Sequence, residues 1–328
     1  MGGHPGGGRW TGPALAWLGT FIERRATPAQ ALLLQLAVEE GHAQAMELSN
    51  GLPAAELPLL VFAAANTTGS APQLALAGCC LSIYLGADIF DNVADDELPD
   101  RWGPHGPALA SLTGVTLLAP FAALALVELQ TSSSTRLLLH EALAEALAAM
   151  SAGQTSDLSM VGREDVSLDA AEQVAVAKTG EELAFFSRAG ALLAECPPDV
   201  CDAYAMLGRH LGASRQIASD CTDLFAGRDA YSHDLASGKR TLPIVYALAT
   251  LPARQRATLL GHLQAAPSDE DRAEAARGIL RASGAIEFGG LVAEIQRRRA
   301  LAALRVAAPR GPGAEALEQY VNDNALFS

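Results

Sequence analysis

Long runs of alanine and leucine at helical spacing constrain the fold of this chain more than any other feature. The segments Leu137–Met150 and Val174–Ala194 repeat apolar residues with the period of an α-helix, and the strict alternation that is typical of strands is rare. Half of the 328 residues are apolar, which is enough to bury a large core. We therefore predict an all-α protein, with a disordered, glycine-rich N-terminus over residues 1–12 and one helical domain over residues 13–328.

Start and stop signals divide this domain into helices. Thr27-Pro28 is typical of a helix start, and Asn50–Pro53 is typical of a break. The apolar stretch Leu112–Val127 contains Pro120 and lacks basic flanks, so it favours a core helix over a membrane span. Helices are predicted over residues 28–49, 73–95, 108–129, 134–151, 168–193 and 200–224, with a polar loop over 227–238 and a further break over 308–312.

Charge and cysteine content narrow the possible partners. The formal net charge of −14 argues against nucleic acid and against electrostatic attachment to anionic membranes. The five cysteines include one adjacent pair, Cys79-Cys80, and have no framework spacing, which fits reduced thiols. Residues Met1–Gly8 lack the order of a signal peptide. We expect a cytoplasmic protein without a nucleic-acid partner and without integral membrane association.

Two acidic stretches end two of the predicted apolar helices. The first acidic segment reads Asp91-Asn92-Val93-Ala94-Asp95-Asp96-Glu97, and the second acidic segment reads Ser219-Asp220-Cys221-Thr222-Asp223. Residues four apart share a helix face, so Asp91 and Asp95 point to one side, as do Ser219 and Asp223. Clustered oxygen ligands suit Mg²⁺, which usually bridges carboxylates to substrate phosphates. The two segments together predict a site that ionises a diphosphate.

Lysine is almost absent from the chain. Of 23 basic residues only Lys178 and Lys239 are lysines, and Lys239 follows the second acidic segment closely. An ammonium group is a compact charge that suits a phosphate oxygen, so both are candidate diphosphate ligands; an arginine-rich codon bias that left two lysines by chance is the alternative. Gln154 and Asp157 lie three residues apart at the end of a predicted helix, where they line a cavity or face solvent.

The order of these segments resembles the trans-isoprenyl diphosphate synthases, or polyprenyl synthetases, of the class I isoprenoid synthase fold. That family carries an acidic motif, a GQxxDL helix, a KT helix, a second acidic motif and a GKxTLP segment. The resemblance implies an all-α bundle around a central active-site cavity, and commonly a homodimer. The matching segments here are Asp91–Asp95, Gly153–Leu158, Lys178-Thr179, Ser219–Asp223 and Gly238–Pro243.

The resemblance also implies a role for each candidate residue. An allylic diphosphate is the expected substrate, and three Mg²⁺ ions are expected to bridge it to the carboxylates, so that pyrophosphate leaves and an allylic cation forms. The implied metal ligands are Asp91, Asp95, Ser219, Asp220 and Asp223, and the implied catalytic residues are the four aspartates among them with Lys178. The implied substrate-binding residues are Lys178, Lys239, Gln154, Asp157, Thr179, Arg101 and Arg228.

The departures from the family pattern concern the metal ligands and the second substrate. Asn92 and Ser219 stand where the family usually has aspartates, and Arg228 is the candidate substitute for a missing lysine. Chain-elongating members hold isopentenyl diphosphate with basic residues, but the stretch 50–59 has no lysine or arginine. An Arg-Arg-Gly segment is reduced here to Arg101-Trp102-Gly103, which leaves a dianion poorly compensated.

We interpret this pattern as an intact ionising half-site with a degraded isopentenyl half-site. The predicted function is a terpene synthase or cyclase that uses a farnesyl- or geranylgeranyl-type diphosphate, or a prenyltransferase to an acceptor other than isopentenyl diphosphate. A conventional elongating synthase, with Arg101 and His105 sufficing, is one alternative. A non-catalytic subunit of a heteromeric synthase is another.

The sequence indicates the length of the substrate and the residues that face the cation only weakly. Small residues at Gly86 and Ala87, just before the first acidic segment, indicate either an open pocket floor for a long chain or close helix packing. Tyr84 and Phe90 face either the cation or the core.

Overall fold

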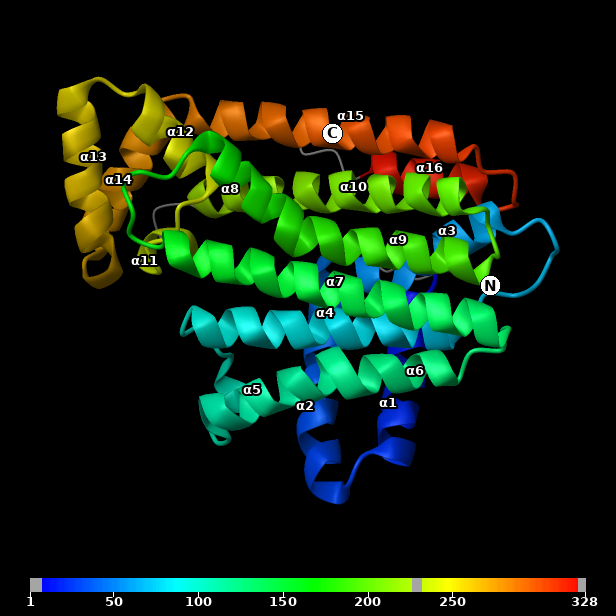
Figure 1. The fold of residues 1–328 in the computed structure, drawn as a ribbon. Helices are drawn as coiled ribbons and strands as arrows, with labels where there is room; N and C mark the ends of the chain where they lie inside the picture. Colours follow the sequence, from blue (N-terminus) through cyan, green and yellow to red (C-terminus); the bar gives the residue numbers. More distant parts are fainter. Residues whose placement is uncertain (1–7, 226–231, 324–328) are drawn as a thin grey trace. The chain divides into compact units, whose positions relative to one another are not determined.

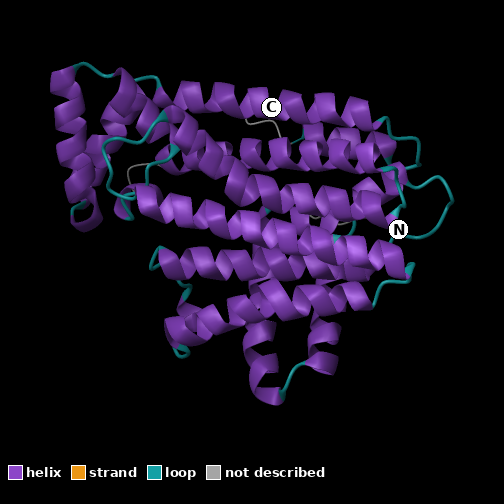
Figure 2. Ribbon diagram, viewed as in Figure 1, coloured by secondary structure: helices purple, strands orange, loops and turns teal. Residues whose placement is uncertain are grey.

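The protein is all-helical in a computed structural model that describes residues 8–225 and 232–323 (Figure 2). These residues contain no strand, as the sequence predicted. They form two compact units, which are described separately. Unit 1 takes in the described residues of Met1–Leu147, Glu182–Gly208 and Ala303–Asp323, and unit 2 takes in those of Ala148–Glu181, Arg209–Ala302 and Asn324–Ser328. The expectation of one domain over 13–328 stays a prediction.

Unit 1 is organised around one long apolar helix, α4 (Leu74–Ala94), which packs against helices before and after it in the sequence (Figure 1). No side chain caps the start of α4, so burial of its apolar residues stabilises it, each large one by about 1.5–3 kcal/mol. The other elements of unit 1 are α1 (Thr11–Arg25), α2 (Pro28–Glu47), α3 (Pro53–Ala65), η1 (Asp100–Trp102), α5 (Gly106–Thr116), η2 (Leu117–Phe121), α6 (Ala122–Val127), most of α9 (Glu181–Leu193) and α16 (Ala314–Asn322).

Unit 2 is a smaller bundle with its own core. Cys221, Leu224, Ile244 and Leu280 belong to one buried cluster, and Ile217 to another. Figure 1 shows α13 and α14 side by side at one edge of this unit. Its elements are α8 (Leu168–Ala175), η3 (Val176–Gly180), α11 (His233–Ala236), α12 (Leu242–Thr250), α13 (Ala253–Ala265), η4 (Ala266–Ser268) and α14 (Glu270–Ala282), with parts of α7 (Ser133–Met160), α10 (Pro198–Phe225) and α15 (Ala285–Ala307).

The predicted helices and loops agree with the structure except at four places. α2 begins at the expected Thr27-Pro28 signal, where Thr27 and Gln30 form a capping box. α7 is longer than predicted and ends at Met160 rather than near residue 151, because Gly153 and Met160 bury one side of its last turns. Two π-helical turns, η2 and η3, lie within predicted helices, and α11 forms inside the predicted loop 227–238.

The N-terminal segment is tied down by a buried carboxylate. Oε1 of Glu56 in α3 accepts hydrogen bonds from the backbone N–H groups of Trp10 (2.6 Å) and Thr11 (2.8 Å), which open α1. The Thr11 hydroxyl donates to the same oxygen and accepts from the N–H of Leu52. Glu56 thus supplies the cap that the side chains at the start of α1 lack; residues 1–7 lie outside the described part, and the disordered N-terminus over residues 1–12 stays a prediction.

Two helical stretches are long and apolar enough to span a membrane, Leu74–Ala94 and Gly106–Val127. The first is two-thirds buried and the second is half-buried inside the protein, as core helices are. This agrees with the expectation of a core helix over Leu112–Val127. The five cysteines are free thiols.

Candidate functional site

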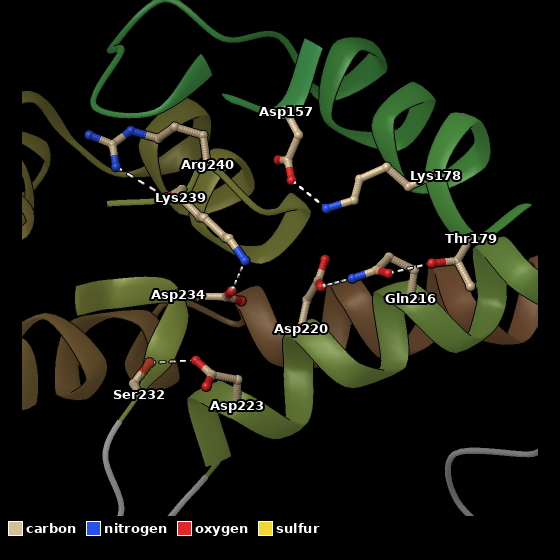
Figure 3. A network of polar contacts seen from close by, with 10 residues as sticks. All are labelled: Asp157, Lys178, Thr179, Gln216, Asp220, Asp223, Ser232, Asp234, Lys239 and Arg240. Atoms are coloured by element: carbon tan, nitrogen blue, oxygen red, sulfur yellow. Dashed lines mark hydrogen bonds and ion pairs between the residues drawn. The ribbon is translucent and has the colours of Figure 1, made fainter. Parts of the chain in front are cut away.

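A small polar cavity lies within unit 2, where α7, η3, α10 and the segment after α11 come together (Figure 3). It encloses about 30 Å³, which is room for a water molecule or an ion. Carboxylates and ammonium groups from segments far apart in the sequence face it. The lining residues are Asp157, Ala171, Val174, Ala175, Lys178, Gln216, Asp220, Asp234, Lys239, Arg240 and Thr241.

Lys178 forms the closest ion pair of this cavity. Its Nζ lies 2.7 Å from Oδ2 of Asp157, and the two side chains are only 12% and 14% exposed. Both residues were predicted to bind substrate. The alternative that Asp157 faces solvent from a helix end is wrong, since Asp157 lies inside α7 and lines the cavity.

A chain of hydrogen bonds connects the neighbouring Thr179 to the second acidic segment. The Thr179 hydroxyl donates to Oε1 of Gln216 (2.6 Å), and Nε2 of Gln216 donates to Oδ1 of Asp220 (2.9 Å) (Figure 3). Burial raises the pKa of Asp220 to about 6, an effect that Gln216 opposes and the nearby Asp157 strengthens. Gln216 was not among the predicted site residues, although its position four residues before Asp220 on one helix is a signal for a shared face.

The third part of the cavity is the segment that carries Lys239. Gly238 adopts a left-handed backbone (φ 72°), which lets the chain turn so that Lys239 N donates to the Asp234 carbonyl. Nζ of Lys239 lies 3.9 Å from Oδ1 of Asp234. Burial, with Asp220 and Asp223 adding to it, raises the pKa of Asp234 well above its usual value, and Lys239 opposes this rise. No spacing in the sequence distinguished Asp234 from other residues of the polar loop.

Arg240 and Asp223 fix this segment from both sides. Nε of Arg240 donates to the carbonyl of Arg163 and Nη1 donates to the carbonyl of Gly238, so this buried arginine braces the turn. Asp223 accepts a hydrogen bond from the Ser232 hydroxyl. Asp223 is thus close to the segment that holds Asp234, as expected for a residue that acts with Asp220.

The π-helical turn η3 sets the positions of Lys178 and Thr179. Such turns are rare and often mark functional sites. Small residues allow neighbouring helices to approach it closely. A methyl group at Gly153 would lie 2.7 Å from the carbonyl carbon of Ala177, and one at Gly212 would overlap the carbonyl of Thr179. These glycines explain why α7 and α10 can present Asp157 and Gln216 to consecutive residues of one turn.

Not every predicted residue of unit 2 lines the cavity. Ser219, a predicted metal ligand, is exposed on α10, one residue before the buried Asp220. Oε1 of Gln154 is buried and has no hydrogen-bond partner among the described residues. Arg228 lies outside the described residues. Oγ1 of Thr241, the threonine of the GKxTLP segment, is a buried atom of the cavity lining without a partner in the described part of the chain.

The first acidic segment lies in unit 1, at the end of α4. Asp95 caps the helix and Asp96 adopts a left-handed backbone (φ 59°) that ends it. The side chain of Asn92 contacts its own helix. Its Nδ2 donates to Oδ2 of Asp88 (3.2 Å), a carboxylate one turn earlier. Nε2 of Gln44 in α2 donates to the same oxygen (3.1 Å). The sequence analysis did not predict Asp88, which lies inside an apolar run.

The expected site for a second diphosphate offers little free positive charge: Arg101 is already in an ion pair, and residues 50–59 include no lysine or arginine. Nε of Arg101 forms an ion pair with Oε1 of Glu40 (2.8 Å), and this arginine is 40% exposed. In the stretch without basic residues, Ala54, Ala55 and Leu57 are fully buried and Glu56 caps α1. This stretch of unit 1 is therefore core.

The small residues before the first acidic segment serve helix packing. A methyl group at Gly86 would lie 2.8 Å from Cγ of Leu118 and 2.9 Å from the Gly114 carbonyl, and one at Gly114 would lie 3.1 Å from the ring of Phe90. Close packing of α4 on α5 and η2 thus explains Gly86, and the ring of Phe90 takes part in it. Tyr84 is half-buried.

The acidic residues fit a divalent cation in charge and position. Both segments lie at helix C-termini, where the helix dipole already disfavours negative charge and favours a cation. Among the described residues no three histidine, cysteine or acidic side chains are close enough to hold one ion by themselves. That suits Mg²⁺, which commonly binds through one or two carboxylates and completes its shell with waters and substrate phosphates.

Known proteins share this fold and sequence. The chain is 22% identical to the polyprenyl synthase of Caulobacter crescentus, solved with calcium and isoprenyl diphosphate, with a TM-score of 0.79 over 97% of this chain and 95% of that one. A polyprenyl synthetase from Streptomyces coelicolor is 27% identical, with a TM-score of 0.76 over 96% of both chains. The (2E,6E)-farnesyl diphosphate synthase of Mycobacterium tuberculosis is 29% identical over 72% of this chain and 67% of its own.

Further sequence matches cover more than half of the chain. The farnesyl diphosphate synthase of Bacillus subtilis is also 29% identical, over 58% of this chain and 70% of its own. The family model described as polyprenyl synthetase matches residues 105–280, more than half of the chain, and includes every residue of the unit 2 cavity. The protein has the all-α class I isoprenoid synthase fold and belongs to the polyprenyl synthetase family of isoprenoid synthases.

Proposed function

We propose that this protein is a prenyl diphosphate synthase, which extends an allylic diphosphate with isopentenyl diphosphate and releases pyrophosphate. The observation that carries the proposal is the cavity of unit 2, where Lys178 and Lys239 lie among buried carboxylates. The sequence suggested a terpene synthase or a transferase to another acceptor, but the relatives support chain elongation better. Several of them are named farnesyl or geranylgeranyl diphosphate synthase.

The two lysines bind the leaving diphosphate in this proposal. Each ammonium group is already held near a carboxylate, so a diphosphate that enters exchanges these carboxylates for phosphate oxygens as partners of Lys178 and Lys239. The Thr179–Gln216–Asp220 chain keeps Asp220 oriented. The allylic carbon–oxygen bond breaks, the isopentenyl double bond attacks the allylic carbon, and a proton is lost.

Magnesium fits the acidic residues and, when bound, supplies positive charge that stabilises the leaving diphosphate. Asp220 and Asp223 of unit 2 are the residues that would hold it there, and Asp91 and Asp95 of unit 1 are the further predicted ligands. Binding of three ions and joint action of the two acidic segments on one diphosphate stay predictions.

A second candidate function is favoured by one feature of unit 1. Arg101 is already paired with Glu40, and the stretch that carries basic residues in elongating enzymes is largely buried here and contains no lysine or arginine. An anionic second substrate gains little at such a place. This favours reaction of one diphosphate alone, as in a terpene synthase, or transfer to an uncharged acceptor.

One experiment separates these candidates. The purified chain is incubated with Mg²⁺ and geranyl, farnesyl or geranylgeranyl diphosphate, with and without isopentenyl diphosphate, and the products are analysed by mass spectrometry. A longer diphosphate that appears only with isopentenyl diphosphate is the expected result. Hydrocarbon or alcohol from one diphosphate alone supports the second candidate. Lack of pyrophosphate release under every condition contradicts both and indicates a non-catalytic subunit.

We also propose that the protein is a cytoplasmic homodimer. The support is the family resemblance together with the five free cysteines. Light scattering on the purified chain tests the dimer, and fractionation of cells that produce it tests the location.

A further inference from the structure

Asp88 is a carboxylate that the reaction proposed above does not use. It lies on α4 three residues before Asp91 and seven before Asp95, so the three carboxylates follow one side of the helix. Its Oδ2 accepts two hydrogen bonds, from Nε2 of Gln44 (3.1 Å) and from Nδ2 of Asn92 (3.2 Å). Two amides from different helices therefore hold this carboxylate in one orientation.

The charged neighbours that act most strongly on Asp88 are other carboxylates. Asp91 and Glu40 both disfavour its negative charge, and the nearby Arg101 is paired with Glu40. A carboxylate that is partly buried among like charges destabilises a fold, and a neutral side chain of similar size is usually the better structural choice. A use of the negative charge itself explains why an aspartate stands at this place.

Asn92 is explained by the same contact. An aspartate at position 92 would place a second carboxylate about 3 Å from Asp88, where two negative charges repel each other strongly. The amide instead donates to Asp88 and removes the repulsion. Positions 88 and 92 thus carry one negative charge between them, and in this chain it lies on the earlier residue.

We propose that Asp88, oriented by Gln44 and Asn92, is a positioning residue of the first acidic segment, whose charge strengthens the binding of the divalent cation at Asp91 and Asp95. The inference rests on the proposed function, because it assumes that a magnesium diphosphate binds to this segment. Asp88 acts by raising the local negative charge, and Asn92 acts by fixing the direction in which Asp88 points.

The test compares Asp88→Asn, Asn92→Asp and the double variant that exchanges the two residues. Binding of Mg²⁺ with inorganic pyrophosphate is followed by calorimetry on the full chain, together with the Mg²⁺ concentration for half-maximal turnover. Asp88→Asn is expected to weaken Mg²⁺ binding by about tenfold or more, in the range seen when groups that support metal ligands are lost. The exchange variant is expected to restore binding to within about threefold, because it returns one charge to the pair.

The same binding measurements supply the control and the results that would contradict the inference. Glu23→Gln, which removes an exposed carboxylate of α1 in the same unit, is expected to leave Mg²⁺ binding unchanged. If Asp88→Asn lowers the melting temperature but not Mg²⁺ affinity, or if the exchange variant binds no better than Asp88→Asn, the inference is wrong. Mg²⁺–pyrophosphate binding without prenyl product contradicts the proposed function only, whereas absence of binding in the unaltered protein contradicts the inference.

Discussion

The carboxylates beside the two acidic segments of this protein are held in opposite ways. In unit 2 the buried carboxylates lie with two lysines, Lys178 and Lys239, and opposite charges are paired before any ligand arrives. In unit 1 neutral amides hold Asp88, while the nearby Arg101 is taken by Glu40. Unit 2 is therefore organised to exchange one anion for another. In unit 1 the hydrogen-bond partners of Asp88 are neutral and Asp91 and Glu40 disfavour its charge, which is a reason to bind a cation.

The largest expected effect comes from removing a charge in the balanced unit. Lys178→Met leaves Asp157 buried without its closest cation, so unfolding should become easier by about 3 kcal/mol. Loss of a group that contacts the leaving diphosphate should lower turnover about 10²- to 10³-fold. Steady-state kinetics and urea unfolding measure the two effects. Arg188→Met, which breaks a more exposed ion pair with Glu145, is the matched control and should change neither by much.

The pH dependence of stability is the next expected effect, and the two units share it. Burial raises the pKa of both Asp88 and Asp220 from 3.8 to about 6. Because the folded-state value is the higher one, each group stabilises the fold most below pH 4, and this contribution is lost as the pH rises through 6. The shift corresponds to about 3 kcal/mol for each group.

Substitution assigns this pH dependence to one unit or the other. Asp88→Asn and Asp220→Asn should each flatten the fall in melting temperature of the ligand-free protein between about pH 4 and 7. Added Mg²⁺ with pyrophosphate should recover stability above pH 6, where the carboxylates are charged. A melting profile of either variant that is parallel to that of the unaltered protein would show that its carboxylate is not the buried group responsible.

A smaller change should come from freeing the arginine of unit 1. Glu40→Gln removes the partner of Arg101 and leaves the guanidinium available to an anion. If the protein elongates, the KM for isopentenyl diphosphate should fall about tenfold with little change in kcat. Glu39→Gln, on the same helix and exposed, is the control. An unchanged KM would mean that Arg101 does not contact the second substrate.

The smallest effect is expected at Ser219. Its side chain is exposed and does not line the cavity, so Ser219→Ala should change turnover and Mg²⁺ dependence by no more than about twofold. A loss of tenfold or more in Mg²⁺ affinity would instead support the sequence-based assignment of Ser219 as a metal ligand.

The sequence predicted what local patterns control. Helical period and capping signals located α2, α4 and α10, and the scarcity of lysine singled out Lys178 and Lys239, which both line the cavity. Residues whose role depends on a partner far away in the sequence were not predicted. Asp88 looks like an isolated charge in an apolar run until Gln44, 44 residues earlier, is seen to hold it. The pairing of Arg101 with Glu40 has no sequence signal either.

Other misses have equally physical causes. Helical periodicity does not reveal a π turn, because the one extra residue changes the spacing only within η3. The small residue Gly86 suits an open pocket and a close helix contact equally well, and only the positions of Leu118 and Gly114 decide between them.

The burial of the stretch that precedes α4 has a consequence for protein engineering. Attempts to install a stronger second-substrate site by grafting lysine or arginine at Ala54, Ala55 or Leu57 would place charges in the core of unit 1, beside a carboxylate that already caps α1. Each graft would damage the scaffold before it created affinity. The more tractable route starts from the exposed side of Arg101, where a new basic neighbour remains in contact with water.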